Sequence, residues 1–543
     1  MHENPPKPAA APTSLERALS LVARPPFHIL ALILFGVFLT THLPFFWYYP
    51  GVDLSQDSNS YLDIVNTMRT GKWPHFIFRT PGYPLFIWAV TALLDRWLAV
   101  IFLQSLLSFA SALCMVYAVF RVRRSLALPA ALAMCGFLGS SQVLFYDISL
   151  LSDSLYTSTV ILSAAFLILA VGRRGPAHFA AVSLLMALAI LVRPAGLYFV
   201  VIYVLVLGHI LWNRYGRGAA LGFAVPFPAV LLAFCAYNYS TLGEFVISPF
   251  AEANYAGATV LFWERDPRLP ALVNDALKGL PDTYRSQGIT PSDLEAVRTS
   301  WDCDLLFGIY VKAYNRMIWG AGWGSGTRFG AGDYLHNRRY IREVSMAAVR
   351  RHPVLYGKLV WANMVMFFRG VGYKFDIYSS LAYRTRGHLP SAAETFYSSG
   401  AGEQPPPSDK QAARPGGGVG DDLSPVARRL LGLQVAWQSL HGMLFQRAFW
   451  SWAYFGVFAL SAVRLVRSRG RLPGAFLLCI LALVPLGASL VVCLVEEATD
   501  RYSYPTQFVY YLSVALVPLL WVSPDPNADA RGKPTGEPGG ARR

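Results

Sequence analysis

Long apolar runs, each about as long as a bilayer is thick, follow one another along most of the chain. A helix needs about 20 apolar residues to cross the hydrocarbon core of a membrane. By that measure the sequence contains ten plausible crossings, in a module at 27–240 and a C-terminal group at 444–523. They lie near residues 27–48, 97–120, 126–146, 154–172, 177–192, 196–213, 219–240, 444–464, 473–494 and 506–523. The pattern predicts an all-α polytopic membrane protein with about ten transmembrane helices.

Short basic groups separate these runs and indicate the side on which each loop lies. They precede the first crossing, follow every second crossing and end the chain: Arg17, Arg24, Arg121, Arg123, Arg124, Arg173, Arg174, Arg214, Arg217, Arg464, Arg467, Arg469, Arg471, Lys533, Arg542 and Arg543. Because Lys and Arg accumulate in cytoplasmic loops, we expect the tails 1–26 and 524–543 to be cytoplasmic, in the inner (plasma) membrane of the cell. The first run lacks the small-residue cleavage site of a signal peptide, so we expect it to stay as an anchor.

The same topology places two polar segments outside the membrane. In the first, 49–96, the apolar stretch from Pro84 to Leu94 is too short to cross, which predicts a helix lying along the interface. The second, 241–443, should form a smaller mixed region on the periplasmic side. Its stretch 354–368 is interpreted as an interfacial helix rather than a crossing, and 398–427 has the composition of a flexible linker.

Composition agrees with a membrane protein and argues against nucleic-acid binding. Charged residues make up 15% of the chain and hydrophobic residues 54%, whereas soluble domains carry about 25% charged residues. The net charge of +15 comes from dispersed basic groups, as expected for cytoplasmic loops. Of the six cysteines, five lie in or beside apolar runs. Their spacing indicates neither a disulfide framework nor a zinc site.

Ionisable residues gather at the predicted external ends of the crossings. They are Asp53, Asp57 and Asp63 after the first; Asp147 and Asp153 between the third and fourth; Arg193 between the fifth and sixth; and Glu496, Glu497, Asp500 and Arg501 between the ninth and tenth. Charges at membrane depth are costly and commonly mark function. Their convergence on one side predicts a functional site there.

Several short motifs at these positions resemble one family of membrane enzymes. They are DSNSY at 57–61, RTPGYPLF at 79–86, LLSDSLY at 150–156, ALAILVRPAGL at 187–197, His352-Pro353 and RYSYP at 501–505. In this order they resemble the GT-C superfamily of membrane glycosyltransferases, and within it the protein mannosyltransferases and lipid A aminoarabinose transferases. Many relatives have Glu where this chain has Asp153. The region 241–443 matches only loosely.

The resemblance implies transfer of a sugar from a polyprenyl-phosphate donor to a periplasmic or extracellular glycan, lipid or protein, with inversion at the anomeric carbon. It implies that Asp57, helped by Asp153 or Asp53, is the catalytic base. It also implies that Arg79, Arg193 and Arg501 bind the donor phosphate. Further donor or acceptor contacts are expected from Tyr61, Tyr83, Tyr502 and His352. The clustered carboxylates could bind a divalent metal, but we predict no metal site and no cofactor.

These residue types suit the expected chemistry. Arginine can bind two phosphate oxygens with its planar guanidinium and does not deprotonate. A carboxylate nearby can take the proton of an attacking hydroxyl, and partial burial tunes its pKa towards a useful value. Holding the departing phosphate is expected to be the larger electrostatic contribution.

Each candidate also has a structural interpretation. Asp57 and Asp153 could cap helices, and Asp53 could merely orient a partner. Arg79 could extend along the interface, Arg193 could anchor a helix at the headgroups, and Arg501 could pair with Glu497 or Asp500. We expect His352 to neighbour a helix-breaking proline rather than to catalyse.

Two other functions stay open. One is a transporter or flippase of lipid-linked sugars, which would need a polar path through the bundle. The other is a polysaccharide polymerase or ligase using diphosphate-linked donors, which would share the topology.

Overall fold

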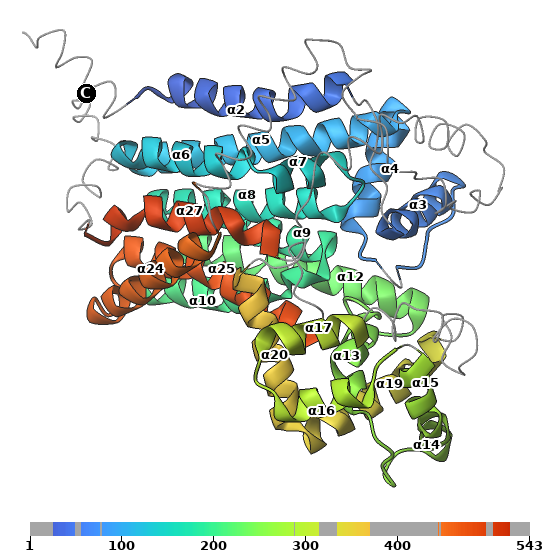
Figure 1. The fold of residues 1–543 in the computed structure, drawn as a ribbon. Coiled ribbons are helices and arrows are strands. Elements are labelled where there is room, and N and C mark those ends of the chain that lie inside the picture. The colour runs from blue at the N-terminus through green and yellow to red at the C-terminus, as the bar shows by residue number, and fades with distance from the viewer. Residues whose placement is uncertain are drawn as a thin grey trace, which may run out of the picture.

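The structure, a computed structural model, describes residues 25–48, 56–76, 79–286, 288–313, 334–369, 444, 447–495 and 503–521. Within these ranges the chain consists of helices and turns and contains no β-strand (Figure 1). A segment inside a membrane must satisfy its own backbone N–H and C=O groups, and an α-helix does so without a partner segment. The all-α prediction is confirmed for this part of the chain.

Seven helices of the described chain are long and apolar enough to cross a membrane. They are α2 (Phe27–Tyr48), α5 (Trp97–Val122), α8 (Ser152–Arg173), α10 (Phe199–Trp212) with the preceding 3-10 turn η2 (Pro194–Tyr198), α11 (Arg217–Ala224) continued by α12 (Pro226–Leu242), α24 (Arg447–Arg467) and α25 (Pro473–Val495).

The other three predicted crossings are less regular. The 3-10 turn η1 (Arg124–Leu126) with α6 (Ala127–Leu138) passes the same test only together with α7 (Ser141–Ile148), and the two parts are bent by 60°. α9 (Pro176–Val192) is apolar but has only 17 residues. Near the C-terminus lie η6 (Tyr504–Thr506), α27 (Gln507–Ala515) and η7 (Val517–Trp521). By length and composition the described residues support seven or eight crossings, and the count of ten stays a prediction.

The apolar helices pack into one bundle with a shared core. α5 lies against α8, α8 against α9, and α2 against α5 and α6. The C-terminal helices α24, α25 and α27 pack on one another, with α27 also against α6 (Figure 1). Core side chains such as Met115, Ile161 and Ile190 are fully buried. The bundle therefore holds the ends of its helices at fixed positions, which matters for the site below.

Several of the basic groups that follow crossings lie at the same end of this bundle. The Arg174 guanidinium, after α8, lies 5.1 Å from the centre of the Tyr215 ring. A Cβ atom on Gly470, in the basic loop after α24, would lie 3.9 Å from the Trp212 ring, so this loop lies beside the loop that carries Tyr215. Because Asp153 and Arg174 lie at opposite ends of α8, the acidic turn before α8 is at the other end. Basic groups thus gather at one end of the bundle and the Asp153 turn lies at the other, while the side of the membrane that each end faces stays a prediction.

The sidedness can be tested by labelling single cysteines from either side of the membrane. We expect positions 60, 300 and 420 to react from outside and positions 123, 467 and 540 only from the cytoplasm, because the arginine groups should face the cytoplasm. Reaction of position 420 from the cytoplasm would instead show that 354–368 crosses the membrane.

The first predicted external loop contains two helices, α3 (Gln56–Arg69) and α4 (Gly82–Leu94). The short helix predicted over Pro84 to Leu94 is thereby confirmed, while its place at a membrane interface stays a prediction. α3 packs on α4, and α4 on α5 and α9. The loop therefore rests on the bundle at one end of it (Figure 1).

A second group of helices is formed by the described part of 241–443. It comprises α13 (Ala251–Thr259), η3 (Val260–Phe262), α14 (Ala271–Lys278), α15 (Leu280–Ser286), α16 (Pro291–Thr299), α17 (Cys303–Ala313), α19 (Tyr334–Arg351) and α20 (Pro353–Arg369). We expected this region to be mixed; where the structure describes it, it consists of helices joined by turns and loops and contains no strand. It has its own buried core, and Tyr356 ties it to the bundle by donating to the Leu494 carbonyl at 2.6 Å. α20 does not meet the criteria for a crossing, and the linker 398–427 lies outside the described residues.

Candidate active site at the α3, α8 and α9 ends

Asp57 and Arg79, predicted separately as base and phosphate ligand, form an ion pair with each other. Asp57 lies in the first turn of α3, and its carboxylate accepts a hydrogen bond from Arg79 Nη2 at 2.6 Å. One turn later, Ser60 Oγ accepts from Arg79 Nε at 2.7 Å. The Arg79 guanidinium also covers the ring of Tyr61, 4.8 Å from its centre. With 24% of the Arg79 and 32% of the Asp57 side chain exposed, the pair is reachable from solvent.

The segment that carries Arg79 is anchored on both sides. Before it, the Pro74 carbonyl accepts from the Tyr237 hydroxyl at 2.9 Å, and Phe76 is buried against the Tyr237 ring. After it, Gly82 begins α4 so close to α9 that a Cβ atom there would lie 2.7 Å from the Leu191 carbonyl oxygen. Only glycine permits this approach without displacing the helix. The close packing thus brings Arg79 towards the end of α9.

Asp153 and Arg193 form a second acid–arginine pair, which is buried. Arg193 Nη1 donates to Asp153 Oδ1, and the side chains are 9% and 0% exposed. Arg193 follows α9 in an extended conformation and precedes Pro194, and the residue before a proline disfavours helix. The headgroup-anchor interpretation of Arg193 is not supported, because its side chain is buried. The capping interpretation of Asp153 is wrong: the N-cap of α8 is Leu151, and Asp153 lies inside the first turn.

The two pairs are joined through α3 and the start of α8. The Tyr61 hydroxyl donates to Ser152 Oγ at 2.9 Å, and Ser152 directly precedes Asp153. Ser58 Oγ donates to the Leu150 carbonyl at 2.9 Å. The helix that presents Asp57 is thus fixed on the turn that presents Asp153, so the structure brings the two predicted acidic elements together at one end of the bundle.

Two tyrosines predicted to contact donor or acceptor are buried in this arrangement. Tyr61 is 3% exposed and Tyr83 is fully buried. Their rings meet edge to face with centres 4.9 Å apart, and the Tyr83 hydroxyl donates to Gln104 Oε1 at 3.1 Å. Here they support the site rather than line an open surface.

The remaining predicted residues lie elsewhere. His352, between α19 and α20, has Nε2 3.3 Å from Glu264 Oε1 and its ring beside Phe262. It therefore belongs to the second helix group and touches neither acid–arginine pair. Asp53, Arg501 and Tyr502 lie outside the described residues. Among the described residues, no three His, Cys, Asp or Glu side chains are grouped so that they could hold a metal ion.

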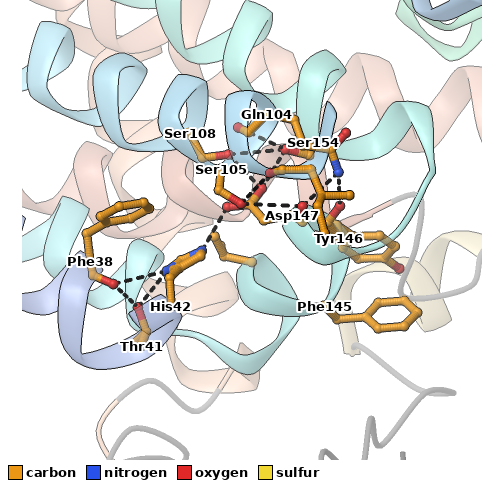
Figure 2. A network of polar contacts seen from close by, with 12 residues as sticks. Phe38, Thr41, His42, Gln104, Ser105, Ser108, Phe145, Tyr146, Asp147 and Ser154 are labelled. Carbon is orange, nitrogen blue, oxygen red and sulfur yellow. Dashed lines mark hydrogen bonds and ion pairs between the residues drawn. The ribbon is translucent and has the colours of Figure 1, made fainter. Parts of the chain in front are cut away.

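The sequence analysis missed a buried polar network next to this site. His42, within the first apolar run, has Nε2 3.0 Å from Asp147 Oδ2 (Figure 2). Asp147 Oδ1 accepts from the hydroxyls of Ser108 and Ser154. An ionisable histidine and a glutamine, Gln104, inside otherwise apolar helices are signals that could have revealed it.

The buried pair predicts a specific pattern of stability. Arg193→Met or Asp153→Leu alone should lower the midpoint of thermal unfolding in detergent, because removing one partner of a buried ion pair costs about 3–5 kcal/mol. The double variant should recover much of the loss. Lys278→Met is the matched control, since its exposed pair with Asp275 should contribute only about 0–1 kcal/mol. Single variants as stable as wild type would contradict the buried pair.

Chemically, this end of the bundle combines a partly exposed arginine, able to bind an anion, with a carboxylate able to accept a proton. The buried Asp153–Arg193 pair lies next to them at the start of α8, where the Tyr61–Ser152 hydrogen bond joins it to α3. Comparison of the chain with protein-family models, with curated proteins and with solved structures gave no match.

Proposed function

We propose that this protein is an inverting membrane glycosyltransferase that moves a sugar from a polyprenyl-phosphate donor to an acceptor outside the cytoplasmic membrane. The observation that supports it best is the partly exposed Asp57–Arg79 pair, which combines a proton acceptor and a phosphate ligand in one place. The GT-C-like motifs at 57–61 and 79–86 supply both residues.

In the proposed reaction, the acceptor oxygen attacks the anomeric carbon as the bond from that carbon to the phosphate oxygen breaks. The bonding electron pair leaves with the phosphate, and the acceptor proton passes to Asp57. While Arg79 holds Asp57, it stabilises the ionised carboxylate and weakens it as a base. A donor phosphate would compete for the same guanidinium. Donor binding would therefore free Asp57 to accept the proton.

Arg193 and Asp153 have supporting parts in this proposal. Because Arg193 is paired to a fully buried carboxylate, reaching a phosphate would require breaking that pair. We therefore assign the first phosphate contact to Arg79, with Arg193 and Arg501 as further candidates. Asp153 and Asp53 remain the alternatives to Asp57 as base.

A transporter of lipid-linked sugars would need a hydrated polar path through the bundle. The buried polar groups between α2, α5 and α7 instead bond to one another, as in the His42–Asp147 contact (Figure 2). Because these groups satisfy one another's hydrogen bonds, they fit a structural role better than the lining of a transport path. A polymerase or ligase would share the Asp57–Arg79 chemistry. It differs from the proposed enzyme only in its donor, which carries the sugar on a diphosphate instead of a monophosphate.

The proposal is tested by mass spectrometry of envelope glycans and lipids from cells lacking the gene. We expect one sugar modification to be lost and to return with the wild-type gene but not with Asp57→Asn. Transfer by the purified protein from monophosphate-linked but not diphosphate-linked sugars would identify the donor class. An unchanged envelope would contradict the enzyme assignment.

A further inference from the structure

His42 and Asp147 form an ionisable contact that the proposed reaction does not use. Their side chains are 1% and 0% exposed, and Nε2 lies 3.0 Å from Oδ2. The contact joins α2 to the end of α7, 105 residues apart. Such groups at membrane depth are costly unless they are paired, so the contact calls for a functional explanation.

Further hydrogen bonds hold both side chains of this contact in place. His42 Nδ1 lies 2.8 Å from Thr41 Oγ1 and 3.2 Å from the Phe38 carbonyl oxygen, so this nitrogen bonds within α2 and Nε2 is turned to Asp147. On Asp147, Oδ1 accepts from Ser108 and Ser154 (Figure 2). The other carboxylate oxygen, Oδ2, faces His42 Nε2 at 3.0 Å.

The turn from Tyr146 to Ser152 is held from several helices at once. Gln104 Nε2 of α5 donates to the carbonyls of Tyr146, Asp147 and Ser149, at 3.1, 2.8 and 2.7 Å. The α3 side chains Ser58 and Tyr61 bind the same turn. Asp147 is its only carboxylate, and His42 holds that side chain from α2. Asp153, which pairs with Arg193, comes directly after this turn.

We propose that His42 and Asp147 are positioning residues that fix the α7–α8 turn and thereby the placement of Asp153 and of α3 with Asp57. The catalytic part of this inference rests on the proposed function. Loss of His42 would leave Asp147 buried without its charge partner, and the turn would have to open to hydrate it. Asp147→Asn should be tolerated, because the amide can donate to Nε2 when the imidazole carries its hydrogen on Nδ1, and its oxygen can still accept from both serines.

Hydrogen–deuterium exchange of the full-length protein in detergent or nanodiscs tests the turn directly. We expect His42→Leu and Asp147→Leu to speed exchange in peptides covering 143–153 by at least about tenfold, through local opening. Exchange within 160–170 of α8 should stay as in wild type, which shows that the variant is folded. His28→Leu, an exposed histidine on the same helix, is the matched control and should change neither segment.

Unchanged exchange over 143–153 in folded His42→Leu would overturn the proposal, whatever the transfer assay shows. Rapid exchange in Asp147→Asn would overturn the hydrogen-bond assignment. In the transfer assay, a displacement of about 1 Å can cost on the order of 10²-fold in rate. We therefore expect such a loss in kcat for His42→Leu and near-normal kcat for Asp147→Asn. A wild-type protein with no transfer would reject the proposed function but leave the exchange result to decide whether the pair fixes the turn.

Discussion

Replacing Asp57 with asparagine should abolish sugar transfer while the protein still inserts, folds and binds its donor. The amide has the size of the carboxylate, and its oxygen can still accept the hydrogen bond that Arg79 Nη2 donates. It cannot take the acceptor proton, so the loss should fall on turnover. Removing a general base typically lowers the rate by about 10²–10⁴-fold. The measurement is turnover and donor binding with a short-chain polyprenyl-phosphate sugar.

Asp63→Asn is the matched control for that experiment. Asp63 lies on the same helix as Asp57 but is exposed to solvent, and its substitution should leave turnover unchanged. Near-normal turnover in Asp57→Asn would move the role of the base to Asp153 or Asp53. Weakened donor binding would instead show that Asp57 mainly orients Arg79.

Hydropathy predicted the helical elements well because each depends on a local run of apolar residues. The short α4 and the failure of α20 to meet the criteria for a crossing were both expected from length and composition. The number of crossings was harder to predict. The run 126–146 sums to a full crossing, yet α6 and α7 are bent by 60° at Gly139 and Ser140. Ser140 caps α7 by accepting from the Val143 N–H at 3.2 Å, and such a cap was a readable sign of a break.

The residues of the site were predicted individually, but their pairing was not. Asp57 meets Arg79 across 22 positions and Asp153 meets Arg193 across 40. These contacts depend on how the helices pack against one another. A single sequence does not show which residues of two helices lie opposite each other. A rule based on local sequence offered a helix cap as the structural alternative for Asp153, whereas the fold buries its side chain beside Arg193. His42 was missed because one polar residue hardly changes the mean hydropathy of its run.

Arg79 should respond differently to lysine and to alanine if it binds the donor phosphate. Arg79→Ala should lose nearly all activity, because removing a hydrogen bond to a charged group costs about 1.5–3 kcal/mol and the departing phosphate also loses its counter-charge. Arg79→Lys should keep part of it, since a lysine supplies the charge without the planar fork. Donor affinity should weaken together with turnover, unlike in Asp57→Asn. Binding of a short-chain polyprenyl-phosphate sugar to the purified variants measures this.

Arg69 provides the matched control for the Arg79 variants. It lies at the end of α3, is exposed, and its guanidinium covers the Trp97 ring at 4.9 Å, as that of Arg79 covers Tyr61. Arg69→Ala therefore removes a similar charge and ring contact without touching Asp57. If Arg79 merely extends along the interface, Arg79→Ala should match Arg69→Ala and stay within about twofold of wild type in donor binding. That result would remove Arg79 from the phosphate site, because the pairing with Asp57 would then only hold the loop in place.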